Sequence, residues 1–475
     1  MAPSPRFAVS RRGQVALIAN TMASAGMPKH WASEGTKCPG SGDLAEALRR
    51  RLLKVKVDAK RRPGTEAGIE AWYRYYAGYT EEFAGHVIEA SALPLGSTVI
   101  DPWNGCGTTT RVADAQGHTA VGIDINPVAT LVASAKLARA QDAIHVTGLA
   151  GRLAARGLSE PATLTKGDPL CKWLCPALTR TYRSIEQGIL ADLAVRDGVV
   201  LNPSAQALPP LAAFLVLALQ RAARHFAGIK TTSNPTWLRP NERTPKHDAE
   251  ALAGVWLEMV RSMAADLEAA AANVHRTGSQ VLLGDARSLP LDDRTVDLVV
   301  TSPPYCTRID YVVNTSFELA ALGTGAKQAS FDELRRSSMG TPLARRAAAP
   351  AADSFPDEVA RVLTSIREHP SKASSNYYYK TYAQYFSDSM ASVAELRRVL
   401  KPGRAAVLVV QSSYYKDIYV DLPGLYAAMG RALGMRAAIA AEYDVNRFLA
   451  QINSRSTAHR KSTAYREAVV VLEAA

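Results

Sequence analysis

The stretch TVIDPWNGCGTTTRVADAQGHTAVGID (Thr98–Asp124) decides the fold class. Its first residues, Thr98–Asp101, predict a short buried strand that runs into a Gly-rich turn. A helix is predicted from Thr108 to Ala115, and a second strand from Ala120 to Asp124. A strand, a helix and a strand within about 30 residues make a βαβ unit, whose two strands run parallel. The chain is therefore predicted to contain a doubly wound α/β domain.

The third strand of this domain is delayed. Residues 136–279 have mostly helical patterns, and the clearest are Leu208–Phe226 and Asp248–Val274. Further strands are predicted only later, at Val281–Asp285, Val296–Thr301, Ala405–Gln411, Arg436–Glu442 and Glu467–Leu472. We therefore predict one α/β domain from residues 66–135 and 280–475. A helical insertion at 136–279, a possible target-recognition region, interrupts it, and a basic segment at 1–65 precedes it.

The composition describes a globular protein with a polyanionic partner. Apolar residues make up 47% and charged residues 21% of the chain, which excludes a mainly disordered protein. Five cysteines without paired spacing exclude a disulfide scaffold and indicate a reducing compartment. No apolar run approaches the roughly 18 residues of a membrane helix, so we expect a cytoplasmic protein without a membrane partner. The net charge of +12 favours attraction to phosphates.

The Gly-rich turn predicts a cofactor site at the end of the first strand. Gly105 and Gly107 let the backbone turn tightly, and Thr108 and Thr109 follow them. Asp124 ends the next strand, where it can accept hydrogen bonds from ribose hydroxyls. A dinucleotide fingerprint would have a third glycine where Thr110 stands, and the Asp101 carboxylate disfavours pyrophosphate. It favours a ligand with an ammonium group, and S-adenosylmethionine has both an ammonium group and ribose hydroxyls.

A second motif, TSPPY (Thr301–Tyr305), follows the predicted strand at Val296–Thr301. Two consecutive prolines stiffen the loop and donate no N–H, while their carbonyls remain free to accept. Ser302 and the Pro303 carbonyl can accept hydrogen bonds from an exocyclic amine, while the Tyr305 ring stacks on a planar base. A rigid turn without a function is the structural alternative.

Four motifs together resemble the bacterial and phage DNA amino-methyltransferases. They are DPWNGCGTTT (Asp101–Thr110), GIDINP (Gly122–Pro127), LLGDARSLP (Leu282–Pro290) and DLVVTSPPY (Asp297–Tyr305). The helix predicted at Trp72–Ala90 is similar to the family's cofactor helix, and Met390–Ser413 to a later helix and strand. The resemblance implies a class I methyltransferase, Rossmann-like sheet that is mostly parallel, with an antiparallel last strand. It also implies S-adenosylmethionine as cofactor and no metal.

The resemblance also assigns roles to individual residues. It implies that Asp124 and Ile125 contact the ribose and adenine of the cofactor, and that Asp285 and Ala286 contact the adenine. Contacts to its methionine part are implied for Asp101, Pro102, Gly105, Gly107, Thr108 and Thr109. The catalytic loop would be Ser302, Pro303, Pro304 and Tyr305, and Asp310 and Tyr311 beyond it could shape the target pocket.

The substrate implied is double-stranded DNA with one base extruded. The sequence SPPY is similar to the N4-cytosine enzymes, whereas adenine enzymes more often carry Asp or Asn in place of Ser302. N4-cytosine methylation is therefore favoured, with N6-adenine methylation, RNA methylation and an inactive DNA-binding subunit as alternatives. Methylation at cytosine C5 through Cys306 is disfavoured, because C5 enzymes place their cysteine directly after proline. A restriction or phage-defence role, with a possible partner protein, follows from the same family.

Two departures affect the assignment of DNA contacts. The catalytic motif follows the cofactor motif, which is not the commonest order among N4-cytosine enzymes, and the insertion interrupts the sheet at an unusual point. Lys230–His247 carries Lys230, Trp237 and Arg239, and is either a DNA-contacting loop or a plain connector. Asn453–Lys461 has the same two interpretations. For the tyrosine-rich Asn376–Phe386 we favour a helix packed on the sheet over base stacking.

Overall fold

The computed structural model describes residues 46–48, 50, 67–74, 78–230, 237–270, 278–306, 310–323, 328–343, 350–445 and 465–475. Most of the basic segment at 1–65 and all of Asn453–Lys461 therefore lie outside the described residues. No helix in the described ranges is long and apolar enough to cross a membrane.

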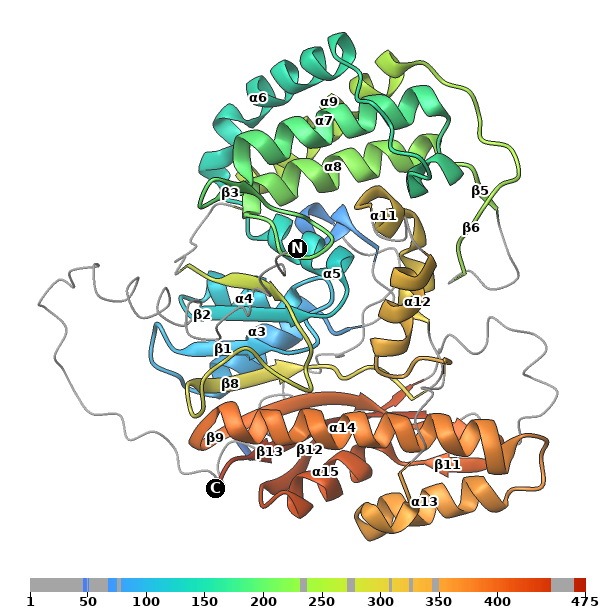
Figure 1. Cartoon of the computed structure of the whole chain (residues 1–475). Helices are drawn as coiled ribbons and strands as arrows, with labels where there is room; N and C mark the ends of the chain where they lie inside the picture. Colours follow the sequence, from blue (N-terminus) through green and yellow to red (C-terminus); the bar gives the residue numbers. More distant parts are fainter. Residues whose placement is uncertain are drawn as a thin grey trace, which may run out of the picture. The chain divides into compact units, whose positions relative to one another are not determined.

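A seven-stranded sheet organises the α/β domain (Figure 1). Its strand order is β12-β13-β9-β8-β1-β2-β7. The four pairs β1–β2, β1–β8, β2–β7 and β8–β9 are parallel, whereas the last strand, β13, is antiparallel to both β9 and β12. The predicted fold class is therefore confirmed. The bounds are β1 Thr98–Asp101, β2 Thr119–Asp124, β7 Gln280–Leu283, β8 Val296–Thr301, β9 Leu400–Gln411, β12 Arg436–Val445 and β13 Tyr465–Glu473.

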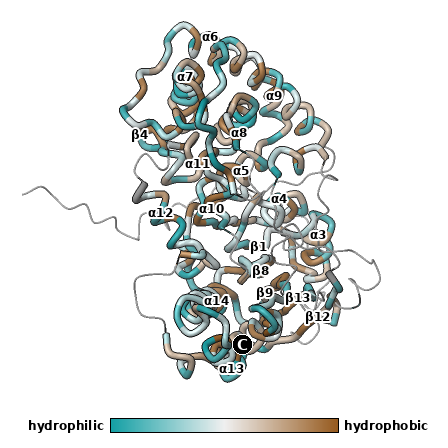
Figure 2. The backbone as a smooth tube through the Cα atoms, turned by 90° about the vertical axis from the view of Figure 1, so that its right-hand side faces the viewer, coloured by the Kyte–Doolittle hydropathy of each residue, from teal (hydrophilic) through white to brown (hydrophobic). Residues whose placement is uncertain are grey.

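Helices cover the two faces of the sheet because successive strand residues point to opposite sides. Val99 of β1 belongs to the same buried cluster as Phe83 and Val87 of α3, whereas Ile100 belongs to the cluster that contains Phe386 of α14. Figure 2 shows β1, β8 and β9 as apolar stretches. The covering helices are α3 Glu81–Ala90, α4 Thr108–Ala115, α5 Pro127–Lys136, α13 Asp357–Glu368, α14 Tyr379–Val399 and α15 Leu422–Ala432.

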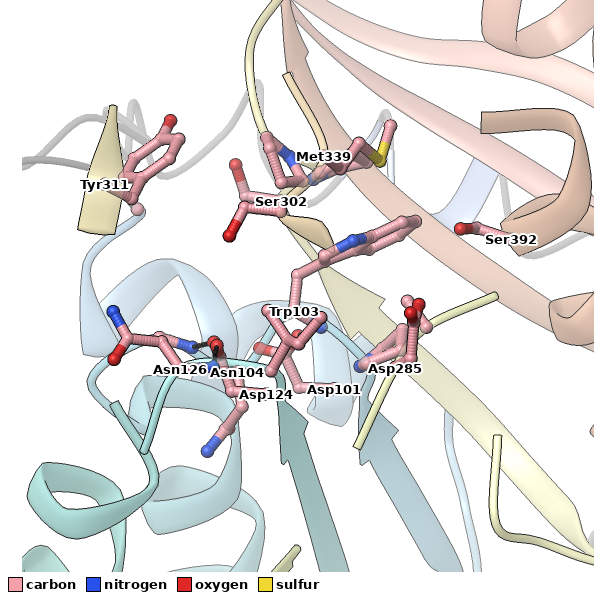
Figure 3. A pocket seen from close by; sticks show the side chains of 18 of the residues that line it. Asp101, Trp103, Asn104, Asp124, Asn126, Asp285, Ser302, Tyr311, Met339 and Ser392 are labelled. Atoms are coloured by element: carbon pink, nitrogen blue, oxygen red, sulfur yellow. Dashed lines mark hydrogen bonds between the residues drawn. The ribbon is translucent and has the colours of Figure 1, made fainter. Parts of the chain in front are cut away.

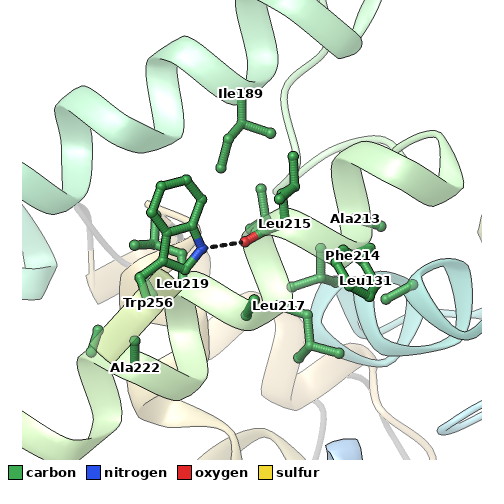
Figure 4. Close-up of a cluster of buried hydrophobic side chains, with 14 of the residues drawn as sticks. Leu131, Ile189, Ala213, Phe214, Leu215, Leu217, Leu219, Ala222 and Trp256 are labelled. Carbon is green, nitrogen blue, oxygen red and sulfur yellow. Dashed lines mark hydrogen bonds between the residues drawn. The ribbon is translucent and has the colours of Figure 1, made fainter. Parts of the chain in front are cut away.

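The insertion forms a bundle of four long helices, α6 Ala140–Ser159, α7 Pro176–Leu193, α8 Pro210–Phe226 and α9 Ala249–Ala269. Helix α8 is central, because eleven of its residues are buried. Figure 4 shows Leu215 and Leu219 of α8 beside Trp256 of α9, whose indole N–H donates to the Leu215 carbonyl (3.2 Å). Short elements nearby are η2 Pro169–Lys172, β3 Val195–Arg196, β4 Val199–Val200, β5 Ile229–Lys230 and β6 Arg239–Pro240.

Two arginines of the bundle hold helix α11 (Ser316–Ala321). Arg183 of α7 donates to the carbonyls of Ala320 (3.0 Å) and Ala321 at the C-terminal end of α11. Arg224 of α8 pairs with the buried carboxylate of Glu318. Since Arg183 also pairs with Asp168 (2.8 Å), its own charge is balanced within the bundle. The insertion is thus fastened to the segment that follows the TSPPY loop.

The helix predicted across Trp72–Ala90 is wrong in its first half. A 3-10 helix, η1 (Gly68–Trp72), comes first, and α3 begins only at Glu81. Gly78 has φ +120°, which a helix does not use, and the Thr80 hydroxyl caps α3 by accepting the Phe83 N–H (3.2 Å). The break places Tyr79 in extended backbone between the two helices.

The tyrosine-rich segment leads into α14 through a π-helical turn, η4 (Ser374–Tyr378). Tyr382, Tyr385 and Phe386 are buried against the sheet, so the packed-helix interpretation is confirmed for this part. The remaining elements are α10 Tyr311–Asn314, α12 Gln328–Ser337, η3 Ala352–Ser354, β10 Ser413–Tyr415 and β11 Ile418–Val420.

Candidate functional site

One cavity opens at the carboxyl ends of β1, β2 and β8 and includes about 1020 Å³ with its mouth (Figure 3). The strand order reverses between β1 and β8, which is where ligands bind in open α/β sheets. The cavity brings together residues of both motifs. Those predicted from the sequence are Asp101, Pro102, Gly105, Thr108, Asp124, Ile125, Asp285, Ala286, Ser302, Pro303, Pro304, Tyr305 and Tyr311.

Asp101 is buried at the floor of this cavity. Its carboxylate accepts hydrogen bonds from the Thr301 hydroxyl (2.5 Å), the Trp103 N–H (3.1 Å) and the Tyr79 hydroxyl (3.3 Å). Burial raises the pKa of Asp101 to about 6, although these donors act in the opposite direction. These donors, and the Thr109 hydroxyl that acts in the same direction, are all neutral, so a cationic group of a ligand would be favoured beside the carboxylate.

Asp124 holds the Gly-rich turn. Its carboxylate accepts the backbone N–H of Gly105 (2.8 Å) and of Asn126 (2.9 Å), and burial raises its pKa to about 6. The side chain therefore closes the turn of the first strand against the end of the second. Since Asp124 also lines the cavity, it can reach a ligand hydroxyl there.

Gly107 and Thr109 do not line the cavity, and their contacts support it from outside. Gly107 has φ +80°, and a Cβ on it would lie 2.8 Å from the Cβ of Ala133, so a side chain would separate the turn from α5. The Thr109 hydroxyl donates to the Val300 carbonyl (3.0 Å) and contacts the Tyr79 hydroxyl. In this structure both residues are packing residues.

Asp285 belongs to an ion network that the sequence did not reveal. Arg287 donates to Asp285 (2.5 Å), to Asp388 of α14 (2.9 Å) and to the Ser337 carbonyl (2.7 Å). Burial raises the pKa of Asp388 to about 7, although Arg287 acts in the opposite direction. The network joins three distant segments along this wall of the cavity.

Several other lining residues were missed as well. Trp103 and Asn104 lie inside the quoted Gly-rich motif, so its own letters could have indicated them. Met339 and Ser392 come from distant segments and have no local signal. In Figure 3 the Trp103 ring extends toward Met339 and Asp285, and so forms an apolar surface beside the acidic side chain.

The catalytic loop candidate, Ser302–Tyr305, faces the cavity opposite the Gly-rich turn. Burial raises the pKa of Tyr305 well above its usual value, although the Ser302 side chain acts in the opposite direction. Burial also raises the pKa of Tyr311 to about 12, so both phenols are neutral at physiological pH. Cys306 is buried and does not line the cavity.

The other residues predicted to contact DNA lie apart from the cavity lining. The Asp310 carboxylate caps α10 through the Val313 N–H (3.1 Å) and pairs with Arg335 (2.7 Å). Lys230 and Arg239 are exposed and face each other in the β5–β6 ribbon, and the Arg239 guanidinium lies 6.0 Å from the Trp237 ring centroid. Residues 231–236 of this loop lie outside the described residues.

A metal site is not evident, since the described residues contain no group of three or more His, Cys, Asp or Glu side chains able to hold an ion. The site therefore consists of two strand-end loops, an acidic floor, an apolar wall and neutral hydroxyls. It can hold a ligand with an ammonium group and a ribose beside a flat polar molecule.

Comparisons with known proteins found one distant relative and no matching family model. A curated protein, the type II methyltransferase M.BsoBI of Geobacillus stearothermophilus, is 25% identical in an alignment 322 residues long that covers 62% of this chain and 59% of the relative. The chain thus spans about three-fifths of that relative's length. The chain is distantly similar to a type II methyltransferase, which supports the methyltransferase resemblance drawn from the motifs.

Proposed function

We propose that this protein transfers a methyl group from S-adenosylmethionine to the N4 amine of a cytosine extruded from double-stranded DNA. One observation carries the proposal: Asp101 and Ser302, from two separate motifs, line the same cavity. The distant similarity to a type II methyltransferase supports it. A role in restriction–modification or phage defence, beside a partner protein, belongs to the same proposal.

The cofactor side of the cavity fits such a ligand. The buried Asp101 carboxylate, whose hydrogen-bond partners are neutral hydroxyl and amide groups, receives the ammonium group. Asp124 receives the ribose hydroxyls, and Asp285 with Ala286 borders the adenine beside Trp103. When bound, the cofactor supplies an electrophilic sulfonium methyl.

The catalytic loop then orients the target amine. The N4 group donates its hydrogens to Ser302 and the Pro303 carbonyl while the base stacks on Tyr305. The nitrogen lone pair attacks the methyl carbon in line, so that the N–C bond forms as the S–C bond breaks, and one amine proton leaves to water. Catalysis is mainly positioning and polarisation. Stacking offsets part of the few kcal/mol that extruding a base costs.

A radiolabel experiment tests this function. The purified chain is incubated with tritiated S-adenosylmethionine and DNA, and the DNA is then digested to nucleosides. Label in 4-methylcytosine is the expected result, and Ser302→Ala is the catalytic control. Label in 6-methyladenine would replace cytosine by adenine in the proposal, and DNA binding without transfer would indicate an inactive subunit.

The DNA contact is proposed for the β5–β6 ribbon, where exposed Lys230 and Arg239 lie beside Trp237. Removing both charges by Lys230→Ala with Arg239→Ala should weaken binding by about tenfold for any DNA sequence. It should also lower, by about 2, the steepness with which the logarithm of the binding constant falls with the logarithm of the salt concentration. The control pair, Lys166→Ala with Arg180→Ala, removes two exposed charges elsewhere on the insertion. An equal loss in both pairs, measured by fluorescence anisotropy at several salt concentrations, would contradict a specific role for the ribbon.

A further inference from the structure

The peptide group between Pro304 and Tyr305 is held by a tyrosine hydroxyl. The Tyr385 hydroxyl of α14 donates to the Pro304 carbonyl at 3.0 Å. The carbonyl of this peptide plane therefore has a side-chain partner that lies 81 residues further along the chain.

The composition of the loop explains why outside partners are needed. Pro303 and Pro304 have no N–H, so the first donor that the backbone offers after Ser302 is the N–H of Tyr305. Such a loop cannot fasten itself by the turn hydrogen bonds that other loops use. Its orientation then depends on what its carbonyls accept and on the packing around it.

Tyr385 is built to be a permanent donor. Its side chain is buried, and burial raises the pKa of its phenol well above the usual value, so the proton stays on the oxygen. A second buried phenol, Tyr426, lies 3.3 Å from the Tyr385 oxygen, and the Ser389 hydroxyl lies 3.3 Å from that of Tyr426. This network keeps the Tyr385 hydroxyl in place below the loop.

The backbone of Gly340, the residue after Met339, also lies close to the catalytic loop. Gly340 has φ +74°, and a Cβ on it would lie 2.8 Å from the Tyr305 carbonyl oxygen. The backbone of residue 340 thus lies directly against the catalytic loop, and little space remains for the peptide of Tyr305 to rotate.

We propose that Tyr385 is a positioning residue of the reaction: it holds the carbonyl of the Pro304–Tyr305 peptide, and thereby directs the Pro303 carbonyl and the Tyr305 ring toward the target base. Tyr385 acts through the loop and does not itself line the cavity. The inference rests on the proposed methyl transfer, because it explains how the loop that holds the amine is kept in one orientation.

The test compares Tyr385→Phe with Tyr379→Phe. Tyr379 lies on the same helix, and its hydroxyl also donates to a proline carbonyl, that of Pro350 (3.2 Å), away from the cavity. Tyr385→Phe should lower kcat by about tenfold to a hundredfold with an unchanged KM for S-adenosylmethionine, because a small misplacement of a reacting group suffices for such a loss. Tyr379→Phe should retain the wild-type kcat. Equal kcat values in the two variants, or a loss confined to KM, would overturn the proposal.

Two further measurements keep the test decisive. Tyr426→Phe removes the hydroxyl that lies 3.3 Å from the Tyr385 oxygen, and it should lower kcat in the same direction even if Tyr385→Phe folds poorly. Hydrogen exchange at the Tyr305 amide should be faster in Tyr385→Phe than in Tyr379→Phe, whether or not methyl transfer occurs. An inactive wild type would thus count against the proposed function alone, whereas equal exchange in both variants would count against the positioning role.

Discussion

The two loops that form the cavity are held in different ways. The Gly-rich turn after β1 is fastened mainly within its own βαβ unit: Asp124 accepts the Gly105 N–H (2.8 Å), and the Asn104 N–H donates to the Ile123 carbonyl (3.0 Å). In the TSPPY loop after β8, the Pro304 carbonyl accepts a hydrogen bond from Tyr385, which is 81 residues further along the chain. The backbone of Gly340 lies directly against the Tyr305 carbonyl of the same loop. The residues that hold the Gly-rich turn therefore belong to the same βαβ unit as the turn itself. The residues that hold the TSPPY loop come from distant parts of the chain, because its two prolines offer no N–H for local hydrogen bonds.

The largest expected effect tests whether the two loops act separately. Tyr305→Ala removes the stacking ring but leaves the Gly-rich turn intact, so turnover should fall by about a hundredfold while cofactor affinity stays unchanged. Tritium transfer measures the first quantity and calorimetric titration with S-adenosylmethionine the second. A parallel loss of affinity would mean that the loops cannot be treated as independent.

A pH titration addresses the turn after β1. Burial raises the pKa of Asp101 from 3.8 to about 6, so the carboxylate takes up a proton as the pH falls through about 6. Because the ammonium group requires the charged carboxylate, affinity for S-adenosylmethionine should fall below pH 6 by about tenfold per pH unit for this one group. Asp101→Asn should bind weakly and show less of this dependence. An affinity that is flat from pH 8 to pH 5 would contradict the role of Asp101.

The smallest expected effect concerns the close approach of Gly340 to the TSPPY loop, and a second glycine serves as the control for backbone strain. Gly340→Ala and Gly403→Ala both place alanine at positive φ, +74° and +71°, and this backbone strain alone should lower the stability of each variant by about 1 kcal/mol. At Gly340 the new Cβ also meets the Tyr305 carbonyl, whereas at Gly403 it meets nothing within 4 Å. Turnover should therefore fall several-fold only in Gly340→Ala. Thermal unfolding and tritium transfer on both variants would show whether the close approach matters.

Much of the fold was predictable because its signals are local. The strand β1, the helix α4 and the strand β2 follow one another within a single apolar and glycine pattern, and the strand end at Thr301 is marked by two prolines. The break between η1 and α3 was missed, because a positive φ at Gly78 outweighs the helical pattern around it. The backbone conformation of Gly78 alone thus explains why one continuous helix was predicted and two separate helices are present.

The candidate site was predictable only where its residues share a motif. Asp101 and Asp124 stand at strand ends, and the sheet brings such ends to one edge. Arg287 follows the predicted Asp285 and Ala286 within a quoted motif, so its position could have been indicated, but its ion pair with Asp388 could not. Met339 lines the cavity and Tyr385 holds the catalytic loop through tertiary packing, and nothing in their neighbouring residues indicates these roles. The pattern of Tyr385 predicts a packed helix face, which is confirmed, but not the hydroxyl bond to Pro304.

The arginine pair that fastens α11 has a consequence for how the chain unfolds. Without the bundle, the last carbonyls of α11 would lose Arg183, and the buried Glu318 carboxylate would lose Arg224. An uncompensated buried charge is strongly destabilising, at about 3–5 kcal/mol when one partner of a pair is removed. We therefore expect the bundle and the sheet to unfold together, because an excised insertion would leave α11 without both arginine partners.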